Sequence, residues 1–202
     1  MCLSDHLTSN NLVNPHQPAY CKHHSTETAV LYIHDNLINA IGSRKISCLC
    51  LLDLLAAFDT TDHNILLTRL SSWFVIHGTA LNWFRSYLSS CCLHVKCNNN
   101  FCCQHTCLRG VPQGSVIGPL LFDMYTTPLS TLVSSLSLNH HLYADDTQLF
   151  LSFHPSHFHS NISHLQNALQ HISYSMTANI LNLNSSKTEF LLIGLKQQLF
   201  KI

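Results

Sequence analysis

A pair of adjacent aspartates between two apolar runs is the feature that most constrains this chain. The sequence Tyr-Ala-Asp-Asp occupies residues 143–146, after the apolar Leu142 and before the apolar pair 149–150. Apolar, polar and again apolar residues predict two strands joined by a tight turn, with Asp145 and Asp146 at the tip of the hairpin. Because like charges repel, the pair is either an ordinary solvated turn or a set of oxygen ligands for Mg²⁺.

Length and composition limit the class of protein. A chain of 202 residues is expected to form one domain, with room for a small appendage. An apolar fraction of 46% supplies a core and excludes a disordered chain. Charged residues are only 10% and the formal net charge is zero, which excludes a strong basic field for nucleic acid. The 16 histidines would add positive charge only below about pH 6.5.

The cysteines and the N-terminus predict an intracellular protein, nuclear or cytoplasmic, and not a secreted one. Met1 is not followed by a basic region and an apolar core, so no signal peptide is expected. The ten cysteines are therefore predicted to be free thiols in a reducing compartment. The best membrane candidate, residues 46–58, is 13 residues long and carries Asp53, so no membrane span is expected.

The remaining pattern predicts an alternation of helices and short strands. Residues 1–24 read as an irregular lead-in, and Ser25 is expected to cap a helix that ends at Gly42. Its apolar stripe is Val30, Ile33, Leu37 and Ile41. The further expected elements are a buried strand at 46–54, a helix from Asp62 to Leu70, a helix from Thr79, a hairpin of 93–97 and 101–106 around the turn 98–100, a helix at 120–125, a long helix from Phe158 and a strand at 190–193.

Two further stretches carry candidate chemistry. Asp53 is the one charge in the apolar run 46–54, so it is expected at the strand end, facing a cation or donor. A helix cap or turn aspartate is the alternative. Residues 110–115, Gly-Val-Pro-Gln-Gly-Ser, form a backbone-dominated loop whose amides can face a phosphate, and a generic loop–helix junction is the alternative.

Histidine and cysteine clusters are the remaining candidates for a metal site. The cysteines crowd one region, but their spacing matches no zinc pattern, and cysteine is a common buried residue. The histidines lie in one polar stretch, and the alternative to a metal site is that they are ordinary polar residues of a surface loop. These residues are Cys91, Cys92, Cys97, Cys102, Cys103, Cys107, His154, His157 and His159.

The order of elements predicts an α+β fold, a sheet with helices on one face. Acidic residues stand at a strand end and at a hairpin tip. A split βαβ arrangement would bring Asp53 and Asp145 together.

Four motifs in order carry a resemblance to a known family. They are residues 51–59 (Leu-Leu-Asp-Leu-Leu-Ala-Ala-Phe-Asp), 110–115, 143–146 and 183–189 (Leu-Asn-Ser-Ser-Lys-Thr-Glu). From about Gln17 to Gly194 the chain resembles the reverse transcriptase domain of a non-LTR (LINE-type) retrotransposon. Any one motif is weak, but four in this order are highly specific.

The resemblance implies a palm-centred domain at 25–194, with partial fingers in the lead-in 1–24, a tail at 195–202 and no thumb. It implies RNA-directed DNA polymerisation with an RNA template, a DNA primer and deoxynucleoside triphosphates. Asp53, Asp145 and Asp146 would hold two Mg²⁺ ions. Lys187 would lie near the pyrophosphate as charge partner or proton donor.

The resemblance also implies a nucleotide pocket. Phe58 falls where the family places its steric gate against a ribose 2′-hydroxyl. Gln113 and Gly114 would shape the pocket, and Tyr143 belongs to the same nucleotide-binding set.

Departures from the family pattern keep two other readings open. The family usually has an arginine after the finger aromatic, where this chain has Cys21 after Tyr20. Similar members tend to have serine at Leu55 and isoleucine at Thr61. One alternative is a catalytically inactive, truncated remnant that acts as an interaction module. The other is a metal-binding module that uses the histidines and cysteines.

Overall fold

The computed structural model describes residues 2–19, 24–90, 92–93, 96–97, 100–103, 105–112 and 114–202. Gln113, Cys21 and the central residues 98–99 of the expected hairpin turn lie outside the described residues. The chain divides into two compact units, Met1–Val13 with Ala56–Tyr125 and Asn14–Leu55 with Thr126–Ile202. We call them the helical unit and the sheet unit and describe each by itself.

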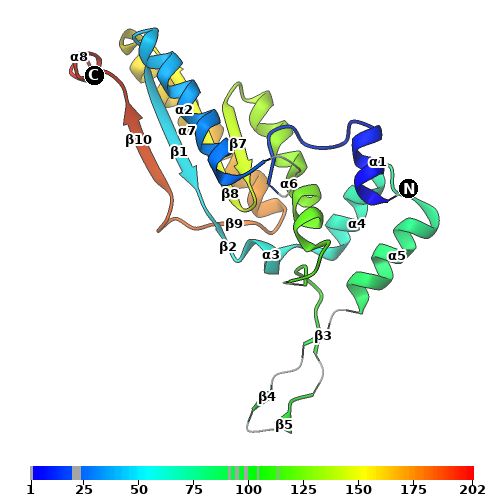
Figure 1. The fold of residues 1–202 in the computed structure, drawn as a ribbon. Coiled ribbons are helices and arrows are strands. Elements are labelled where there is room, and N and C mark those ends of the chain that lie inside the picture. The colour runs from blue at the N-terminus through cyan, green and yellow to red at the C-terminus, as the bar shows by residue number, and fades with distance from the viewer. Residues whose placement is uncertain are drawn as a thin grey trace. The chain divides into compact units, whose positions relative to one another are not determined.

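The sheet unit is built on a four-stranded antiparallel sheet in the order β10-β1-β8-β7 (Figure 1). Its strands are β1 (Ile46–Leu52), β7 (Asn139–Tyr143), β8 (Asp146–Phe153) and β10 (Glu189–Ile193). Strands β1 and β7 both run antiparallel to β8, which lies between them, so they run in the same direction. This is the split βαβ arrangement expected from the sequence.

Helices of the sheet unit contact both faces of the sheet. They are α2 (Thr26–Gly42), the end of α6 (Gly118–Ser135) and α7 (Phe158–Ala178). His140 of β7 contacts Ser130 of α6, and Phe153 of β8 contacts the first residue of α7. The next residue of β7, His141, contacts Tyr32 of α2. Because successive side chains of a strand point to opposite faces, α6 and α7 share one face and α2 covers the other. The sequence had predicted helices on one face only.

The long helix α7 and the strand β1 carry much of the core of the sheet unit. Apolar residues spaced three or four apart from Phe158 onward predict a buried stripe on α7. It is confirmed at Leu165, Ile172 and Met176, which are buried, with Ala168 added to it. Helix α2 begins at the cap Ser25, as expected. Its buried residues are Ala29 and Ala40. Of the predicted stripe, Ile33, Leu37 and Ile41 are half-buried and Val30 is 64% exposed.

The helical unit contains α1 (Leu3–Ser9), α3 (Ala57–Thr60), α4 (His63–Ser72), α5 (Gly78–Ser89) and the start of α6. The short strands β3 (Cys92–Leu93) and β6 (His105–Thr106) pair with each other, as do β4 (Lys96–Cys97) and β5 (Asn100–Phe101). The expected hairpin is therefore present in the described residues. Asp62 caps α4 by accepting hydrogen bonds from the backbone of Asn64 and Ile65, as predicted.

Three boundaries differ from the sequence prediction. The lead-in 1–24 is not irregular throughout, because Asp5 accepts a hydrogen bond from the Cys2 amide at the start of α1. The tail 195–202 contains a single-turn helix, α8 (Lys196–Leu199). Helix α6 does not end at Tyr125 but continues through Pro128, because Leu129 and Val133 extend its buried stripe.

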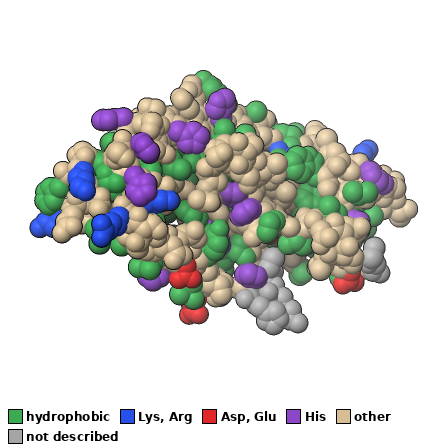
Figure 2. Space-filling view, turned by 90° about the horizontal axis from the view of Figure 1, so that it is seen from above, with side chains coloured by type: hydrophobic (Ala, Val, Ile, Leu, Met, Phe, Trp, Pro, Cys, Tyr) green, Lys and Arg blue, Asp and Glu red, His purple; other side chains and the backbone are tan. Residues whose placement is uncertain are grey.

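The surface carries few charges. On the face shown in Figure 2, basic and acidic side chains are sparse, while histidine and hydrophobic side chains are more numerous. None of the helices in the described residues is both long and apolar enough to cross a membrane.

Candidate active site

The ends of β1 and β8 bring three aspartates to one edge of the sheet. Leu52, the last residue of β1, pairs with Thr147 of β8. Asp53 follows Leu52 and Asp146 precedes Thr147, so the same register sets these two aspartates opposite each other. Asp145 is the next residue, in the turn between β7 and β8.

The hairpin tip differs from the sequence prediction by one residue. Tyr143 pairs with Asp146, so Asp146 is the first residue of β8 and the turn consists of Ala144 and Asp145. Ala144 has a φ of 55°, in the left-handed region. Tyr143 is half-buried beside the turn.

Asp53 is held by the segment that follows β9 (Asn182–Leu183). Strand β9 pairs with β2 (Leu54–Leu55), directly after Asp53. The Asn184 backbone amide donates to the Asp53 carbonyl oxygen at 2.9 Å, and its side-chain Nδ2 donates to Asp53 Oδ2 at 2.8 Å. Lys187 Nζ lies 3.5 Å from the same Oδ2. The expected partnership of Asp53 with a donor is therefore present, and Lys187 lies beside Asp53.

The three aspartates influence one another electrostatically. Burial raises the pKa of Asp146 above its ordinary value, and the nearby charges of Asp145 and Asp53 raise it further. Lys187 acts in the opposite direction. Negative charge therefore accumulates at this edge, and a bound divalent cation would reduce the repulsion between the carboxylates.

The donor set suits Mg²⁺, which prefers carboxylate oxygens. Members of the reverse transcriptase family use divalent metal ions, as the resemblance described above implies. In the part of the chain that the structure describes, however, no three His, Cys, Asp or Glu side chains gather closely enough to hold a metal ion. Asp53 instead faces Asn184 and Lys187. The carboxylate oxygens of these residues are therefore chemically suitable ligands for the metal. In this structure Lys187 neutralises the carboxylate of Asp53.

A second group of expected site residues lies in the helical unit. Phe58 of α3 packs on Phe122 of α6, with ring centroids 4.5 Å apart. The Val111 amide donates to the Phe58 carbonyl at 2.9 Å, and the Gly110 amide donates to the Thr61 carbonyl at 2.7 Å. These two hydrogen bonds hold the loop 110–112 against α3, so the structure brings Phe58 and this loop together.

The backbone of the loop requires glycine at one point. Gly110 has a φ of 86°, and a Cβ there would lie 3.1 Å from the Asp59 carbonyl oxygen. Gly114 also has a positive φ, of 79°. At the end of the loop the Ser115 hydroxyl accepts a hydrogen bond from the Gly118 amide at 2.9 Å, which starts α6.

Two residues of the candidate site were not assigned roles from the sequence. Asn184 lies in a quoted motif, but its bond to Asp53 joins residues 131 apart. Gln17 contacts Ala144, 127 residues away, through both ends of its side-chain amide. Neither contact leaves a periodic signal in the sequence. The one local indication for Asn184 is that it lies in the same motif as Lys187, three residues away.

Comparisons with known proteins agree with the architecture. A family model described as reverse transcriptase (RNA-dependent DNA polymerase) matches residues 1–201. The chain is 28% identical over 127 residues to a probable RNA-directed DNA polymerase from transposon BS of Drosophila melanogaster, covering 63% of this chain and 14% of that protein. It is 25% identical over 120 residues to the corresponding protein of transposon X-element, covering 59% of this chain and 13% of that protein.

Solved structures share the fold at low sequence identity. Apo telomerase from Candida tropicalis, truncated from its C-terminal domain, matches with a TM-score of 0.68 at 14% identity over 95% of this chain and 39% of that chain. Telomerase from Candida albicans, in complex with a fragment of telomeric RNA, matches with a TM-score of 0.69 at 16% identity over 94% of this chain and 32% of that chain.

The strand order and the acidic edge define a polymerase-type palm, and the chain belongs to the reverse transcriptase (RNA-dependent DNA polymerase) family. The transposon relatives confirm the resemblance to non-LTR retrotransposon reverse transcriptases. The chain spans about one seventh of the length of these relatives, 14% and 13%.

Proposed function

We propose that this chain is a fragment of an RNA-directed DNA polymerase and carries its nucleotidyl-transfer centre. The observation that supports this most is the edge of the sheet where Asp53 stands opposite Asp146, with Asp145 in the adjoining turn. Family membership supports the reaction, and the negative charge gathered by these carboxylates supports its assignment to this edge.

Asp53, Asp145 and Asp146 would hold two Mg²⁺ ions. Ions bound there would activate a primer 3′-hydroxyl and neutralise the charge of the triphosphate and the leaving pyrophosphate. Lys187, which lies beside Asp53, would turn its ammonium group toward the pyrophosphate as charge partner or proton donor. Asn184 keeps the Asp53 carboxylate oriented through its Nδ2 donor.

The helical unit would supply the nucleotide pocket. Phe58 would exclude the ribose 2′-hydroxyl, and Gln113 and Gly114 would shape the pocket. Tyr143, in the sheet unit, is proposed separately as a nucleotide-binding residue. The substrates would be an RNA template, a DNA primer and deoxynucleoside triphosphates. One of the similar structures contains an RNA fragment, which supports an RNA partner for this fold.

A specific observation favours a second function, that of an inactive remnant which acts as an interaction module. Lys187 lies on Asp53, and the described residues contain no ready cluster of three metal ligands. The ten Lys and Arg residues are balanced by ten Asp and Glu residues, which weakens the attraction to phosphates. Primer extension separates the two functions.

The test is extension of a DNA primer on an RNA template by the purified chain, with Mg²⁺ and deoxynucleotides. We expect slow extension at about 50 mM salt, because few basic residues hold the phosphates, and a fall of roughly tenfold at about 200 mM, which about two phosphate contacts would produce. A DNA template of the same sequence serves as the control for template type. No extension at low salt, with either Mg²⁺ or Mn²⁺, would establish the inactive remnant instead.

The steric gate makes a separate prediction. Phe58→Ala should raise the use of ribonucleotides relative to deoxyribonucleotides by roughly tenfold or more, because the ring no longer opposes the 2′-hydroxyl. Single-nucleotide extension with each sugar measures the ratio. Phe122→Leu is the matched control, because it disturbs the same ring contact from a fully buried position and should leave the ratio unchanged. Equal ratios in the wild-type and Phe58→Ala chains would remove Phe58 from this role.

A further inference from the structure

The segment just after the helical unit's first helix lies along the edge of the catalytic hairpin. Strand β7 is an edge strand of the sheet, and the Leu142 amide near its end donates to the His16 carbonyl at 2.7 Å. The segment Asn14–Gln17 therefore occupies part of the edge that β7 would otherwise leave without a backbone partner. We call this segment the clamp.

Gln17 ends the clamp at the turn itself. Its Nε2 donates to the Ala144 carbonyl at 3.0 Å, and its Oε1 accepts from the Ala144 amide at 3.1 Å. The side chain is buried, with 2% of its surface exposed. One amide thus fixes both the N–H and the C=O of the residue before Asp145.

The fixed residue has a conformation that alanine rarely adopts. Ala144 has a φ of 55°, and a non-glycine residue in the left-handed region costs on the order of 1 kcal/mol or more. Such a conformation persists when its surroundings determine it. The two hydrogen bonds from Gln17 offset this cost and select one orientation of the turn.

The start of the clamp is anchored on α6 and β7. Asn14 Oδ1 accepts from the His16 amide at 3.0 Å and from the Ser130 hydroxyl at 3.2 Å. The same hydroxyl shares a hydrogen bond with His140 Nε2, at 2.7 Å.

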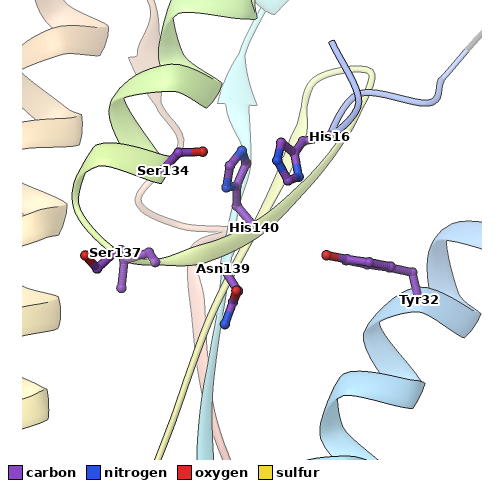
Figure 3. A pocket seen from close by; sticks show the side chains of 7 residues that line it. His16, Tyr32, Ser134, Ser137, Asn139 and His140 are labelled. Atoms are coloured by element: carbon purple, nitrogen blue, oxygen red, sulfur yellow. The ribbon is translucent and has the colours of Figure 1, made fainter.

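Ring packing completes the anchor. The ring of His16 packs on the ring of His140, with centroids 4.2 Å apart (Figure 3). Gln17 is therefore held in place by contacts on the residues before it.

We propose that Gln17 is a positioning residue, which holds the Ala144–Asp145 turn so that Asp145 and Asp146 are presented to a divalent cation. It acts through Ala144 and not on the reacting atoms. The cation part of this inference rests on the proposed function. The hold on the turn is measurable whether or not a cation binds.

The experiment compares Gln17→Leu and Gln17→Glu with the matched control Ser47→Ala. Leucine removes both hydrogen bonds at similar size, and glutamate keeps the acceptor but loses the donor. Ser47 is buried in the same sheet unit and shares a hydrogen bond with Ser152 at 2.7 Å, so its loss lowers stability away from the turn. Amide hydrogen exchange at Ala144 and Mn²⁺ affinity are measured on each folded chain.

We expect Gln17→Leu to exchange the Ala144 amide about tenfold faster or more, whereas Gln17→Glu should stay closer to wild type because its carboxylate still accepts from that amide. Both variants should bind Mn²⁺ about tenfold more weakly, with Ser47→Ala close to wild type in both measurements. Unchanged Ala144 exchange in Gln17→Leu, or equal acceleration in Ser47→Ala, would overturn the positioning role. So would loss of cooperative unfolding in both Gln17 variants, which would make Gln17 a residue of global stability. Absence of Mn²⁺ binding by the wild-type chain would count against the proposed function, while the exchange result still decides the hold on the turn.

Discussion

Asp145→Ala is expected to reduce primer extension by roughly a thousandfold or more. The substitution removes a carboxylate from the turn that adjoins Asp53 and Asp146, and charge stabilisation of the transition state is lost with it. The fold should persist, because Asp145 lies in a turn and its charge contributes to the repulsion at this edge.

A second measurement on the same variant is independent of activity. The Asp145 charge raises the pKa of Asp146, after the larger effect of burial, so the pKa of Asp146 should fall in Asp145→Ala. An NMR titration of the Asp146 carboxyl measures this. Asp35→Ala, which removes an exposed carboxylate on α2, is the control and should leave both extension and the Asp146 pKa unchanged. Synthesis that survives Asp145→Ala would refute the assigned active site.

Local sequence patterns predicted the elements that carry the site. The apolar run before Asp53 and the hairpin around Asp145 are recognisable because strands and tight turns depend on neighbouring residues. The period of the stripe in α7 predicted its buried face for the same reason. The fold class followed from the order of these elements, since an alternation of strands and helices allows few sheet topologies.

Contacts between distant residues explain what the sequence did not predict. Gln17 reaches Ala144 across 127 residues and Asn184 reaches Asp53 across 131, so neither pair belongs to a local pattern. The placement of Asp146 in β8 is decided by its pairing with Tyr143, and turn propensity alone does not fix that register.

Helix boundaries failed for a related reason. The helix predicted at 120–125 continues as α6 past Pro128, because burial of Leu129 and Val133 outweighs the lost backbone hydrogen bond. The sequence pattern also did not predict that an acidic residue of this helix is buried. Asp123 lies in the same helix and is only 9% exposed.

The buried carboxyl of Asp123 makes the stability of the chain depend on pH. Burial raises the pKa of Asp123 to about 8, well above its ordinary value of 3.8. The folded state therefore keeps a proton that the unfolded state releases as pH rises through about 4. The stability that goes with this proton is fully present below the unfolded pKa and is lost progressively until the folded pKa, near 8, is reached.

Asp123→Asn should remove this dependence, because asparagine has a similar size and stays neutral. We expect the variant to exceed the wild type in unfolding free energy by a margin that is small at pH 4 and grows to at most about 4 kcal/mol at pH 7. Urea unfolding at several pH values measures the margin, and titrations of His140 and other groups common to both chains cancel in the difference. Asp35→Asn, at an exposed carboxylate, should stay within about 0.5 kcal/mol of wild type throughout. A margin that does not grow between pH 4 and pH 8 would show that Asp123 is ionised in the folded chain, with its charge balanced inside the helical unit.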